Sequence, residues 1–590
     1  MKKLLEILTP AEKKKAVFLA ALMIGHAFLE VTGIASIAPF LAVLGDPAAI
    51  QKHEGLAKAY DILGFESAAA FVTFLGIVAF GVLILSSAFK ALVYYLKVRF
   101  ANMRRYTLAT RLVRKYTEQP YPFFLQRNTN EMAKVAFSEV DNVVANGILP
   151  VLDIVSYGVV SVAIVLLLVA VSPIVAFSVG GFFLFFYLLL YLRFKNSVHK
   201  MGVLRKEAQT TLYKTLSEIL GGIKELKVLG NEEAYLDKFR PASLAFARFQ
   251  TGAQVISELP RYVVEALGFC VSFGVIIFLL KQGKSLSEIL PVVGIYVFAG
   301  YRLLPAMQNI YGALTKLKYG LSSLDTVHHD FTSIKPAAPA PDVSPDERLC
   351  LHDRLVFDNV DYSYPGSDRK ALDGISFVLR AKSSLGIIGT TGAGKSTLID
   401  VILGLLPYGA GAVTVDGVTL SEGNARQWQN NIGYVPQHIF LSDDTVMRNI
   451  AFGIADKDID MDKVVLAATM AQIHGFISAD LPQGYNTGIG ERGIRLSGGQ
   501  RQRIGIARAL YHNPDILIFD EATSALDSET EREVMASIEN LTGQKSIIIV
   551  THRLDTIRTC DQTIAIERGK IKDITGNHTA AGGENSHAAR

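Results

Sequence analysis

Residues 385–406 read LGIIGTTGAGKSTLIDVILGLL. An apolar run, a glycine-rich turn with Lys395 and Ser396, and a second apolar segment follow one another, which is typical of a strand, a phosphate-binding loop and a helix. Glycines let the backbone close around a phosphate, and N–H groups at the helix start supply partial positive charge. The motif therefore predicts a nucleotide site formed by Gly389, Thr390, Thr391, Gly392, Ala393, Gly394, Lys395, Ser396 and Thr397. We expect Lys395 to reach the β- and γ-phosphates and Ser396 to bind Mg²⁺.

Two further motifs fit the same chemistry. Residues 516–521, ILIFDE, form an apolar strand that ends in two carboxylates. We expect Asp520 to hold the Mg²⁺ shell and Glu521 to orient or deprotonate an attacking water, although two carboxylates can also cap a helix. Residues 496–500, LSGGQ, precede the helical pattern RQRIGIARAL. This second helix start predicts another anion site in the same domain.

The order of these motifs resembles the nucleotide-binding domain of ATP-binding cassette (ABC) proteins over about residues 355–575. The resemblance implies that Tyr364 of YSYPG stacks on adenine and that Gln437 of YVPQ senses Mg²⁺ and the γ-phosphate. His552 of IVTHRL would position the γ-phosphate as a catalytic partner of Glu521. Ordinary alternatives are an edge-strand aromatic for Tyr364 and a surface histidine for His552.

The same resemblance implies contacts between the cassette and other parts of the protein, and it implies a dimer. Glu491 and Gly493 of GERG would contact a membrane part, and residues 524–527, SALD, would face a second cassette, with Asp527 at the nucleotide. In this family LSGGQ of one cassette closes over the phosphate loop of another. The residues that would act in trans are Ser497, Gly498, Gly499 and Gln500. Because the chain has one cassette, two identical chains are expected, in a domain-swapped homodimer that binds ATP and Mg²⁺.

The first half of the chain has the composition of a membrane protein. Half of all residues are hydrophobic, 19% are charged and the mean hydropathy is +0.30, which predicts a chain partly solvated by lipid. Apolar stretches long enough to cross a bilayer lie at residues 16–44, 69–97, 143–171, 173–194, 259–280 and 286–314. Lysines and arginines follow the second and fourth stretches and precede the first, so both termini are expected in the cytoplasm.

Composition also excludes other classes. Three cysteines are too few and too scattered for a disulfide scaffold or a thiolate metal site. A net charge of +4 is explained by basic loops on one side of the membrane, so nucleic-acid binding is not implied.

These patterns predict a multi-pass α-helical membrane domain of six transmembrane helices fused to an α/β phosphate-loop domain. The expected layout is a membrane domain at 1–318, a linker at 319–354 with the proline-rich segment 335–345, a cassette at 355–575 and a flexible tail at 576–590. Strands are expected at 355–362, 384–388, 516–519 and 546–550.

Six spans upstream of a cassette resemble the exporter half-transporters. Coupling helices are expected near residues 121–124 and within 212–229. LEVTGIASIAPFLAVL (29–44), the segment after Asp46 and GGIKELKVLGNEE (221–233) are similar to the flippases of bacterial protein N-glycosylation. That resemblance implies a polyprenyl-pyrophosphate oligosaccharide that is flipped to the periplasmic leaflet of the bacterial inner membrane. The rivals are a multidrug or lipid A type exporter and, from another class, an ATP-gated channel or regulatory subunit.

Charged residues within the spans point to a substrate site. At about 1.5 Å per residue, Lys90, Arg261 and Arg302 fall in the inner part of the bilayer. A basic ring there could receive a pyrophosphate. Lys90 could instead extend to lipid phosphates, and Arg261 could pair with Glu258 or Glu265.

Other features of the spans remain open. Glu30 and Asp153 either pair with basic residues or stabilise helix packing. The segment 46–65 is expected to form an amphipathic helix or, alternatively, a cap over the outer face. Its residues expected toward lipid are Ile50, Leu56, Ala57, Tyr60 and Leu63.

Overall fold

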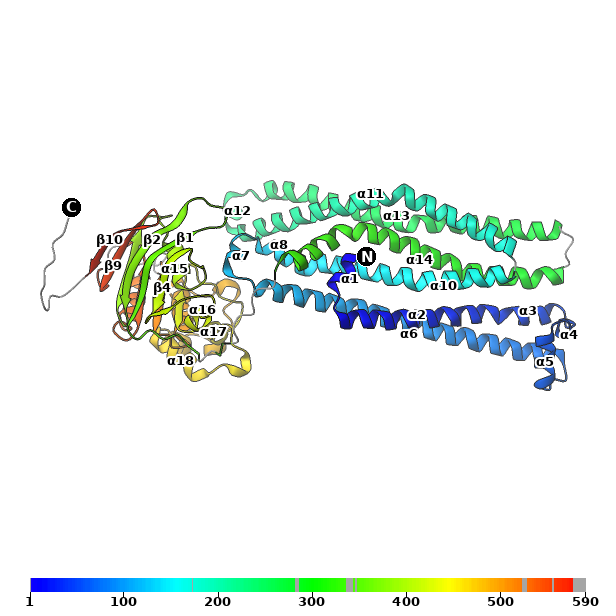
Figure 1. Cartoon of the computed structure of the whole chain (residues 1–590), viewed down its shortest axis with the longest axis horizontal. Helices are drawn as coiled ribbons and strands as arrows, with labels where there is room; N and C mark the ends of the chain where they lie inside the picture. Colours follow the sequence, from blue (N-terminus) through cyan, green and yellow to red (C-terminus); the bar gives the residue numbers. More distant parts are fainter. Residues whose placement is uncertain are drawn as a thin grey trace. The chain divides into compact units, whose positions relative to one another are not determined.

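The computed structural model describes residues 2–171, 173–281, 286–335, 343–344, 347–522, 528–553 and 557–576. The chain divides into two compact units (Figure 1). Residues 1–119 and 126–336 form the helical unit, and residues 120–125 and 337–590 form the sheet unit.

The helical unit consists of long helices joined by short connections. Its α-helices are α1 Lys2–Ile7, α2 Pro10–Ala35, α3 Ile37–Gly45, α4 Ala49–Lys52, α5 Glu54–Ile62, α6 Ala68–Thr117, α8 Thr129–Lys134, α9 Val140–Val143, α10 Leu149–Val171, α11 Pro173–Gly221, α12 Ile223–Leu229, α13 Glu232–Lys281 and α14 Leu286–Ser333. Two π-helical turns, η1 Val135–Glu139 and η2 Val144–Ile148, link α8, α9 and α10. Helix α2 packs on α6, α10 on α14 and α11 on α13 (Figure 1).

Helices α6, α11, α13 and α14 are longer than a bilayer is thick. Among the described residues, three segments are long and apolar enough to cross a membrane: Pro10–Gly45, Ala68–Thr117 and Thr129–Ala170. Helix α6 has 50 residues, and at 1.5 Å per residue it extends about 75 Å, against a hydrocarbon core of about 30 Å. The predicted stretches at 69–97, 173–194, 259–280 and 286–314 are therefore parts of longer helices that continue beyond the apolar region.

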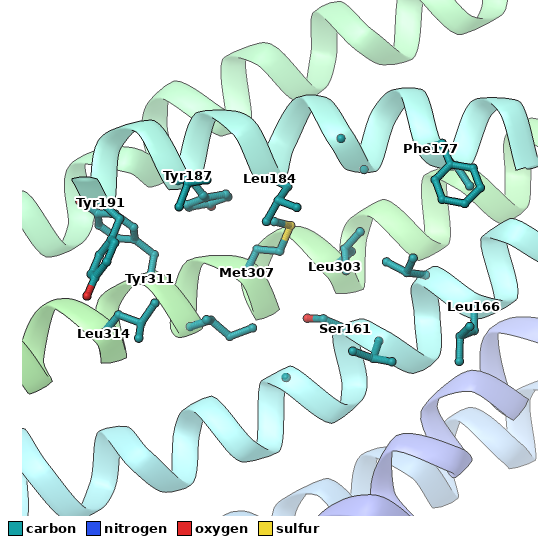
Figure 2. Close-up of a pocket in the computed structure, with 18 residues that line it drawn as sticks. Ser161, Leu166, Phe177, Leu184, Tyr187, Tyr191, Leu303, Met307, Tyr311 and Leu314 are labelled. Carbon is teal, nitrogen blue, oxygen red and sulfur yellow. The ribbon is translucent and has the colours of Figure 1, made fainter. Parts of the chain in front are cut away.

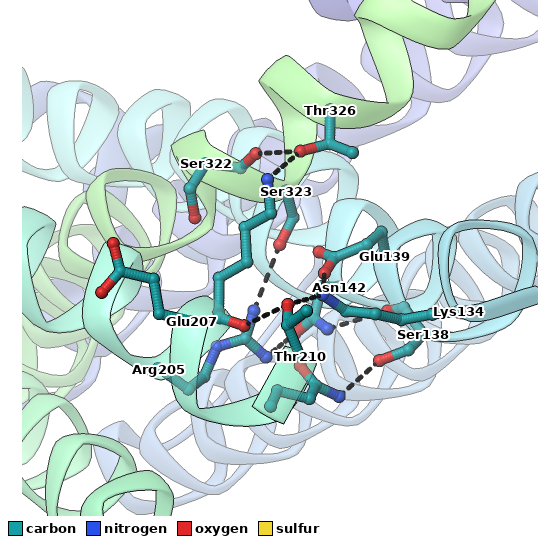
Figure 3. A network of polar contacts seen from close by, with 12 residues as sticks. Lys134, Ser138, Glu139, Asn142, Arg205, Glu207, Thr210, Ser322, Ser323 and Thr326 are labelled. Atoms are coloured by element: carbon teal, nitrogen blue, oxygen red, sulfur yellow. Dashed lines mark hydrogen bonds and ion pairs between the residues drawn. The ribbon is translucent and has the colours of Figure 1, made fainter. Parts of the chain in front are cut away.

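A buried polar network joins the π-helical turns to two other helices (Figure 3). Lys134 pairs with Glu139, a spacing of five residues that a π turn accommodates, at 3.4 Å between Nζ and Oε1. The Lys134 ammonium also donates to Thr210 of α11, and Arg205 of α11 donates to Asn142 and to Ser323 of α14. The network ties η1 and α9 to α11 and α14.

The segment 46–65 differs from its expected form. It contains two short helices, α4 and α5, rather than one. Ile50 is buried, and Leu56 and Tyr60 pack with it against Phe71 of α6. Ile50 therefore lies in this cluster and does not face lipid as expected, whereas Leu56, Ala57 and Tyr60 are half-buried. Leu63 remains exposed.

The expected linker, 319–354, also begins differently. Helix α14 continues to Ser333, so the first part of that range is helical. Most of the proline-rich segment and the tail beyond residue 576 lie outside the described residues.

The sheet unit contains two sheets. The antiparallel sheet has the order β2-β1-β4-β5, with β1 Arg354–Ser363, β2 Lys370–Arg380, β4 Ala410–Val415 and β5 Val418–Thr419. The larger sheet has the order β10-β9-β3-β8-β7-β6, with β3 Ser384–Gly389, β6 Ile432–Val435, β7 Ile516–Asp520, β8 Ser546–Val550, β9 Gln562–Glu567 and β10 Lys570–Gly576. Strands β9, β3, β8, β7 and β6 are parallel.

Both faces of the larger sheet are covered. Along β7, Ile516 and Ile518 enter the core shared with β1, β2 and α15 Lys395–Ile402, whereas Leu517 and Phe519 enter the core on the opposite face. That alternation follows from the two-residue period of a strand. The helices of this unit are, besides α15, α7 Tyr121–Leu125, α16 Ala425–Gln429, α17 Val446–Ile450, α18 Met461–Met470, α19 His474–Ala479, α20 Gly498–Leu510 and α21 Ser528–Glu539, with the 3₁₀ turns η3 Asp456–Asp458, η4 Gly484–Asn486 and η5 Glu491–Gly493.

Candidate functional site

The parallel strands bring the predicted nucleotide residues to one edge of the larger sheet. Strand β3 leads into the glycine turn and α15, β6 leads to Gln437, β7 ends at Asp520 and β8 leads to His552. Strands β3, β8, β7 and β6 are neighbours in that order. Because parallel strands end at the same edge, motifs far apart in the sequence meet there.

The glycine turn depends on the absence of side chains at two positions. A Cβ at Gly389 would overlap the carbonyl oxygen of Ile566, and Gly394 has φ +110 with Ala371 O only 2.7 Å from the place of a Cβ. Only glycine fits both places without strain. Lys395, which is buried, donates to the carbonyl oxygens of Gly389 at 2.8 Å and Thr390 at 3.2 Å. The ammonium group is therefore held at the turn.

Gln437, Glu521 and His552 lie together. The Gln437 amide donates to Glu521 Oε2 at 2.9 Å, and His552 Nδ1 lies 3.7 Å from Glu521 Oε1. Glu521 has φ +46, a conformation that is unusual for a residue with a side chain. Its backbone N–H donates to Val550 at the end of β8, which holds the carboxylate at the sheet edge.

Asp520 has two neighbours that the sequence analysis did not assign. The Tyr434 hydroxyl donates to Asp520 Oδ2 at 3.4 Å. Burial, together with the charge of Glu521, raises the pKa of Asp520. Burial and the charge of Asp520 raise the pKa of Asp400 on α15 to about 6. In the sequence, Tyr434 lies three residues before Gln437, and Asp400 lies one helical turn after Ser396. These two spacings are the signals that could have linked Tyr434 and Asp400 to the nucleotide site.

Tyr364, which is expected to stack on adenine, and Tyr121 of the first expected coupling segment both have a neighbour on α15. The Tyr364 hydroxyl is 3.0 Å from the Thr397 hydroxyl, and the Tyr364 ring packs edge-on against Tyr362. Tyr121 of α7 belongs to the same unit, and burial, followed by the charge of Asp400, raises its pKa. The first predicted coupling segment therefore forms a helix beside α15.

LSGGQ begins helix α20. The Ser497 side chain accepts from the Gln500 backbone N–H at 3.2 Å, and the Gln500 side chain accepts from the Ser497 N–H at 2.8 Å. This reciprocal cap leaves the N–H groups of the glycines between them at the helix start. Gly499 is buried, Gly498 is half-buried and Ser497 is exposed.

Three residues were predicted to contact other parts of the assembly, and the structure does not test these roles. Glu491 and Gly493 form the turn η5, where Glu491 is exposed and Gly493 is buried. Asp527 lies outside the described residues. Their roles stay predictions.

The oxygen donors at this edge fit Mg²⁺. Asp520 supplies a carboxylate, Ser396 an exposed hydroxyl and Gln437 an exposed amide. Hard oxygen ligands of this kind, few in number, are typical of a Mg²⁺ ion that is also held by nucleotide phosphates.

Arg302 in the helical unit has a partner that was not assigned to it. Arg302 Nη1 lies 2.9 Å from Glu30 Oε1, and the other Glu30 oxygen lies 3.2 Å from His26 Nε2 and accepts from Ser86 at 3.2 Å. Only 4% of the Glu30 side chain is exposed, against 24% of Arg302. Arg302 thus neutralises a buried carboxylate, which resolves the open assignment of Glu30.

The other charged residues of the apolar stretches differ from Arg302 in their partners and in their exposure. Lys97 pairs with Asp153 at 2.5 Å and lies over the rings of Tyr94 and Tyr157, so Asp153 is also part of an ion pair. Lys90 is exposed and within electrostatic range of Glu30. Arg261 is exposed, and in the described part of the chain it forms no ion pair with Glu258 or Glu265. Lys90 and Arg302 therefore share Glu30 as a neighbouring charge.

One two-sheet unit holds a phosphate loop, a carboxylate pair at a strand end and an LSGGQ helix, and the other unit of the chain consists of long apolar helices. Together they define a membrane protein with a nucleotide-binding cassette. Comparisons with known proteins identify the class. Residues 18–291 match the ABC transporter transmembrane region and residues 372–524 match the ABC transporter family.

Curated relatives share the name ATP-dependent lipid A-core flippase. The chain is 33% identical to the Dechloromonas aromatica protein over 377 residues, 63% of each chain, and 30% identical to the Albidiferax ferrireducens protein over 419 residues, 70% of this chain and 68% of that one. The chain thus spans about 63% of the length of the first of these relatives. A bacterial Atm1-family ABC exporter solved with ATP bound has the same fold, with a TM-score of 0.70, 24% identity and 95% of each chain covered.

The chain belongs to the ABC transporter family. It has the fold of an ABC exporter, which confirms the predicted fold class of a transmembrane region joined to an ABC nucleotide-binding domain.

We predict that Glu521→Gln preserves ATP binding and lowers ATP hydrolysis by about 10²–10⁴-fold, because the amide cannot accept a proton from water. ATP binding and steady-state phosphate release by the purified chain measure the two effects. Gln437→Ala, which removes a neighbour and not the proposed base, should lose less. Hydrolysis at the wild-type rate by Glu521→Gln contradicts the assignment.

We predict that Arg302→Met lowers the free energy of unfolding by about 3 kcal/mol, because it leaves the buried Glu30 carboxylate without its cation. Replacing Glu30 by methionine as well should recover most of the loss. Arg261→Met is the matched control, since Arg261 is exposed. Equal unfolding midpoints in denaturant for Arg302→Met and Arg261→Met would refute a structural role for the ion pair.

Proposed function

We propose that this chain is an ATP-hydrolysing ABC exporter that works as a homodimer. It transfers an amphipathic glycolipid of the lipid A type from the cytoplasmic to the periplasmic leaflet of a bacterial inner membrane. The observation that carries the proposal is the meeting of Gln437, Glu521 and His552 at the end of the phosphate-loop sheet, in a chain whose relatives are named lipid A-core flippases.

The residues at the sheet edge have complementary tasks in hydrolysis. Lys395 can exchange two backbone carbonyls for phosphate oxygens, which accept more strongly because they are charged. Glu521 accepts from Gln437 with one oxygen and keeps the other toward His552, so a water between this carboxylate and the γ-phosphate would be oriented for attack. Bound Mg²⁺ supplies charge neutralisation of the phosphates.

A second copy completes the site in this proposal. Ser497 and Gln500 satisfy each other across the first turn of α20, and the helix start still offers backbone N–H groups to an anion. The γ-phosphate held by the phosphate loop of the other chain is such an anion. ATP then favours the closed pair of cassettes and hydrolysis releases it, and α7 and α12 transmit the change to the helices.

The comparisons favour the lipid A type cargo over the polyprenyl-pyrophosphate oligosaccharide expected from sequence. The relatives carry the lipid A name, and Arg302, one of three cations proposed for the pyrophosphate, is occupied by Glu30. The exposed Lys90 and Arg261 keep the oligosaccharide carrier as a second candidate, since exposed cations can meet phosphate groups.

Reconstitution of the full chain in proteoliposomes tests the cargo. We expect ATP-dependent transfer of lipid A to exceed that of a polyprenyl-pyrophosphate oligosaccharide and of plain phospholipid by about tenfold, a difference in transition-state binding of about 1.4 kcal/mol. Lys395→Ala is the control that removes nucleotide coupling.

Two other outcomes of this experiment would support the alternative functions. Faster movement of the polyprenyl lipid would select the second candidate. ATP-dependent ion current without lipid movement would reject the exporter in favour of a channel.

A further inference from the structure

Residues 347–351, ERLCL, lie across the cassette before β1 and are called the strap below. The Leu349 N–H donates to the carbonyl oxygen of Gln427 in α16 at 3.0 Å. The Leu351 side chain is buried in the core shared with β1, β2 and α15. Along the chain, the strap follows α14, which ends at Ser333. It therefore connects the helical unit to the first strand of the cassette.

Arg348 of the strap holds the end of helix α20. Its Nη2 donates to the carbonyl oxygen of His512 at 2.7 Å, and its Nη1 donates to that of Asn513 at 3.2 Å. Asn513 has φ +49 and donates its N–H to Leu510, so it terminates α20 in the left-handed conformation. Carbonyl groups at a helix end carry partial negative charge, which a guanidinium matches. The strap is thus bonded to one end of the helix whose other end is LSGGQ.

The strap also contacts the beginnings of two strands of the larger sheet. Asn431, which is fully buried and precedes β6, donates to the Leu349 carbonyl at 3.2 Å and to Asp515 Oδ2 at 2.8 Å. Asp515 precedes β7 and also accepts from the Leu351 N–H at 3.4 Å. Strand β7 ends at the carboxylates of the nucleotide site. The strap therefore lies at the edge of the sheet opposite that site.

Helix α20 is suited to carry a displacement from one end to the other. It has 13 residues and is about 20 Å long. Its middle is fastened to the segment that follows Gln437. A Cβ at Gly505 would overlap the side chain of Ile439, and Arg508 donates to the carbonyl oxygen of Phe440 at 2.7 Å. A helix held in this way moves as a rigid element, so a shift at the strap also shifts LSGGQ and the segment after Gln437.

Helix α14 supplies the connection to the rest of the helical unit. It packs on α10, α11 and α13. With α10 and α11 it surrounds an apolar cavity of about 630 Å³, which Leu303 and Met307 of α14 line (Figure 2). A change in the packing of these helices displaces α14, and the chain runs from the end of α14 to the strap.

We propose that Arg348 is a positioning residue for ATP hydrolysis, which sets the place of LSGGQ in response to α14. A cover for the sheet needs only the apolar side chains of the strap, whereas Arg348 places both terminal nitrogens on the end of α20. The inference rests on the proposed homodimer, in which LSGGQ meets the nucleotide of the second chain. It adds a connection along one chain to those through α7 and α12.

A longer linker tests the proposal without touching any contact of Arg348. Gly-Ser-Gly-Ser inserted after Pro341 lengthens the connection by up to about 13 Å. In full-length chain in proteoliposomes, we expect the ratio of ATP hydrolysis with lipid A to hydrolysis without it to fall about fivefold, the lower end of typical coupling between two sites. Affinity for ATP should stay at the wild-type value, because the phosphate loop is unaltered. A wild-type ratio in the insertion variant would overturn the proposal.

Substitution of Arg348 supplies the second arm. Arg348→Met should lower the same ratio about fivefold with unchanged ATP affinity, and Arg348→Lys should recover part of it by keeping the charge. Arg354→Met is the matched control, since the Arg354 side chain is 60% exposed and its Nε lies 3.5 Å from Asp353 of the adjacent position. Equal ratios for Arg348→Met and Arg354→Met would refute the role of Arg348.

Combining the two changes separates positioning from stability. Arg348→Met in the insertion variant should cause no further loss, because both changes interrupt one connection. Additive losses would mean that Arg348 acts only through the stability of the cassette, which contradicts the proposal. The insertion variant alone decides the matter where Arg348→Met does not fold.

Cross-linking separates this inference from the proposed cargo. Chains with Ser497→Cys and with Thr391→Cys, lacking the native cysteines and carrying Glu521→Gln, are mixed with MgATP and no lipid. The insertion and Arg348→Met should each slow the disulfide between chains about fivefold, and Arg354→Met should not. If lipid A fails to stimulate the wild type but these rates differ, the cargo proposal fails and the role of Arg348 stands. Equal rates in all variants would overturn that role.

Discussion

The absence of water inside a bilayer is the constraint on which the helical unit depends. A charge in that environment is stable only beside a partner, so each ion pair fixes the packing of two helices. Glu30 with Arg302 joins α2 to α14, and Lys97 with Asp153 joins α6 to α10. The second pair also lies between two tyrosine rings. These contacts fix how α2 packs with α14 and how α6 packs with α10.

The same constraint determines what the helices leave for a ligand. Arg302 is neutralised by Glu30, whereas the exposed Lys90 and Arg261 form no ion pair among the residues that the structure describes.

The nucleotide site could be predicted because its chemistry is written in short motifs with fixed spacing. A glycine turn between a strand and a helix, or two carboxylates at a strand end, has few other uses, and parallel strands bring such motifs to one edge. Tyr434 and Asp400 could not be found in this way, since their closeness to Asp520 depends on the order of strands in the sheet.

Ion pairs between helices that are far apart in the sequence could not be predicted from the residues around each partner. Glu30 and Arg302 are on the first and last long helices, so their contact depends on how the bundle closes. The π turns before α10 and the packing of α4 and α5 on Phe71 likewise follow from neighbours in space. Hydropathy predicted the apolar stretches and not the ends of the helices, because the helical hydrogen bonds continue into water.

The proposed transport cycle depends on two chains that close over ATP, with LSGGQ of one facing the phosphate loop of the other. Cross-linking measures this directly: a chain with Ser497→Cys is mixed with a chain with Thr391→Cys, both lacking the native cysteines and carrying Glu521→Gln. We expect a disulfide-linked pair of chains that forms with MgATP and is absent without nucleotide. A pair that never forms, or forms equally without ATP, would contradict it.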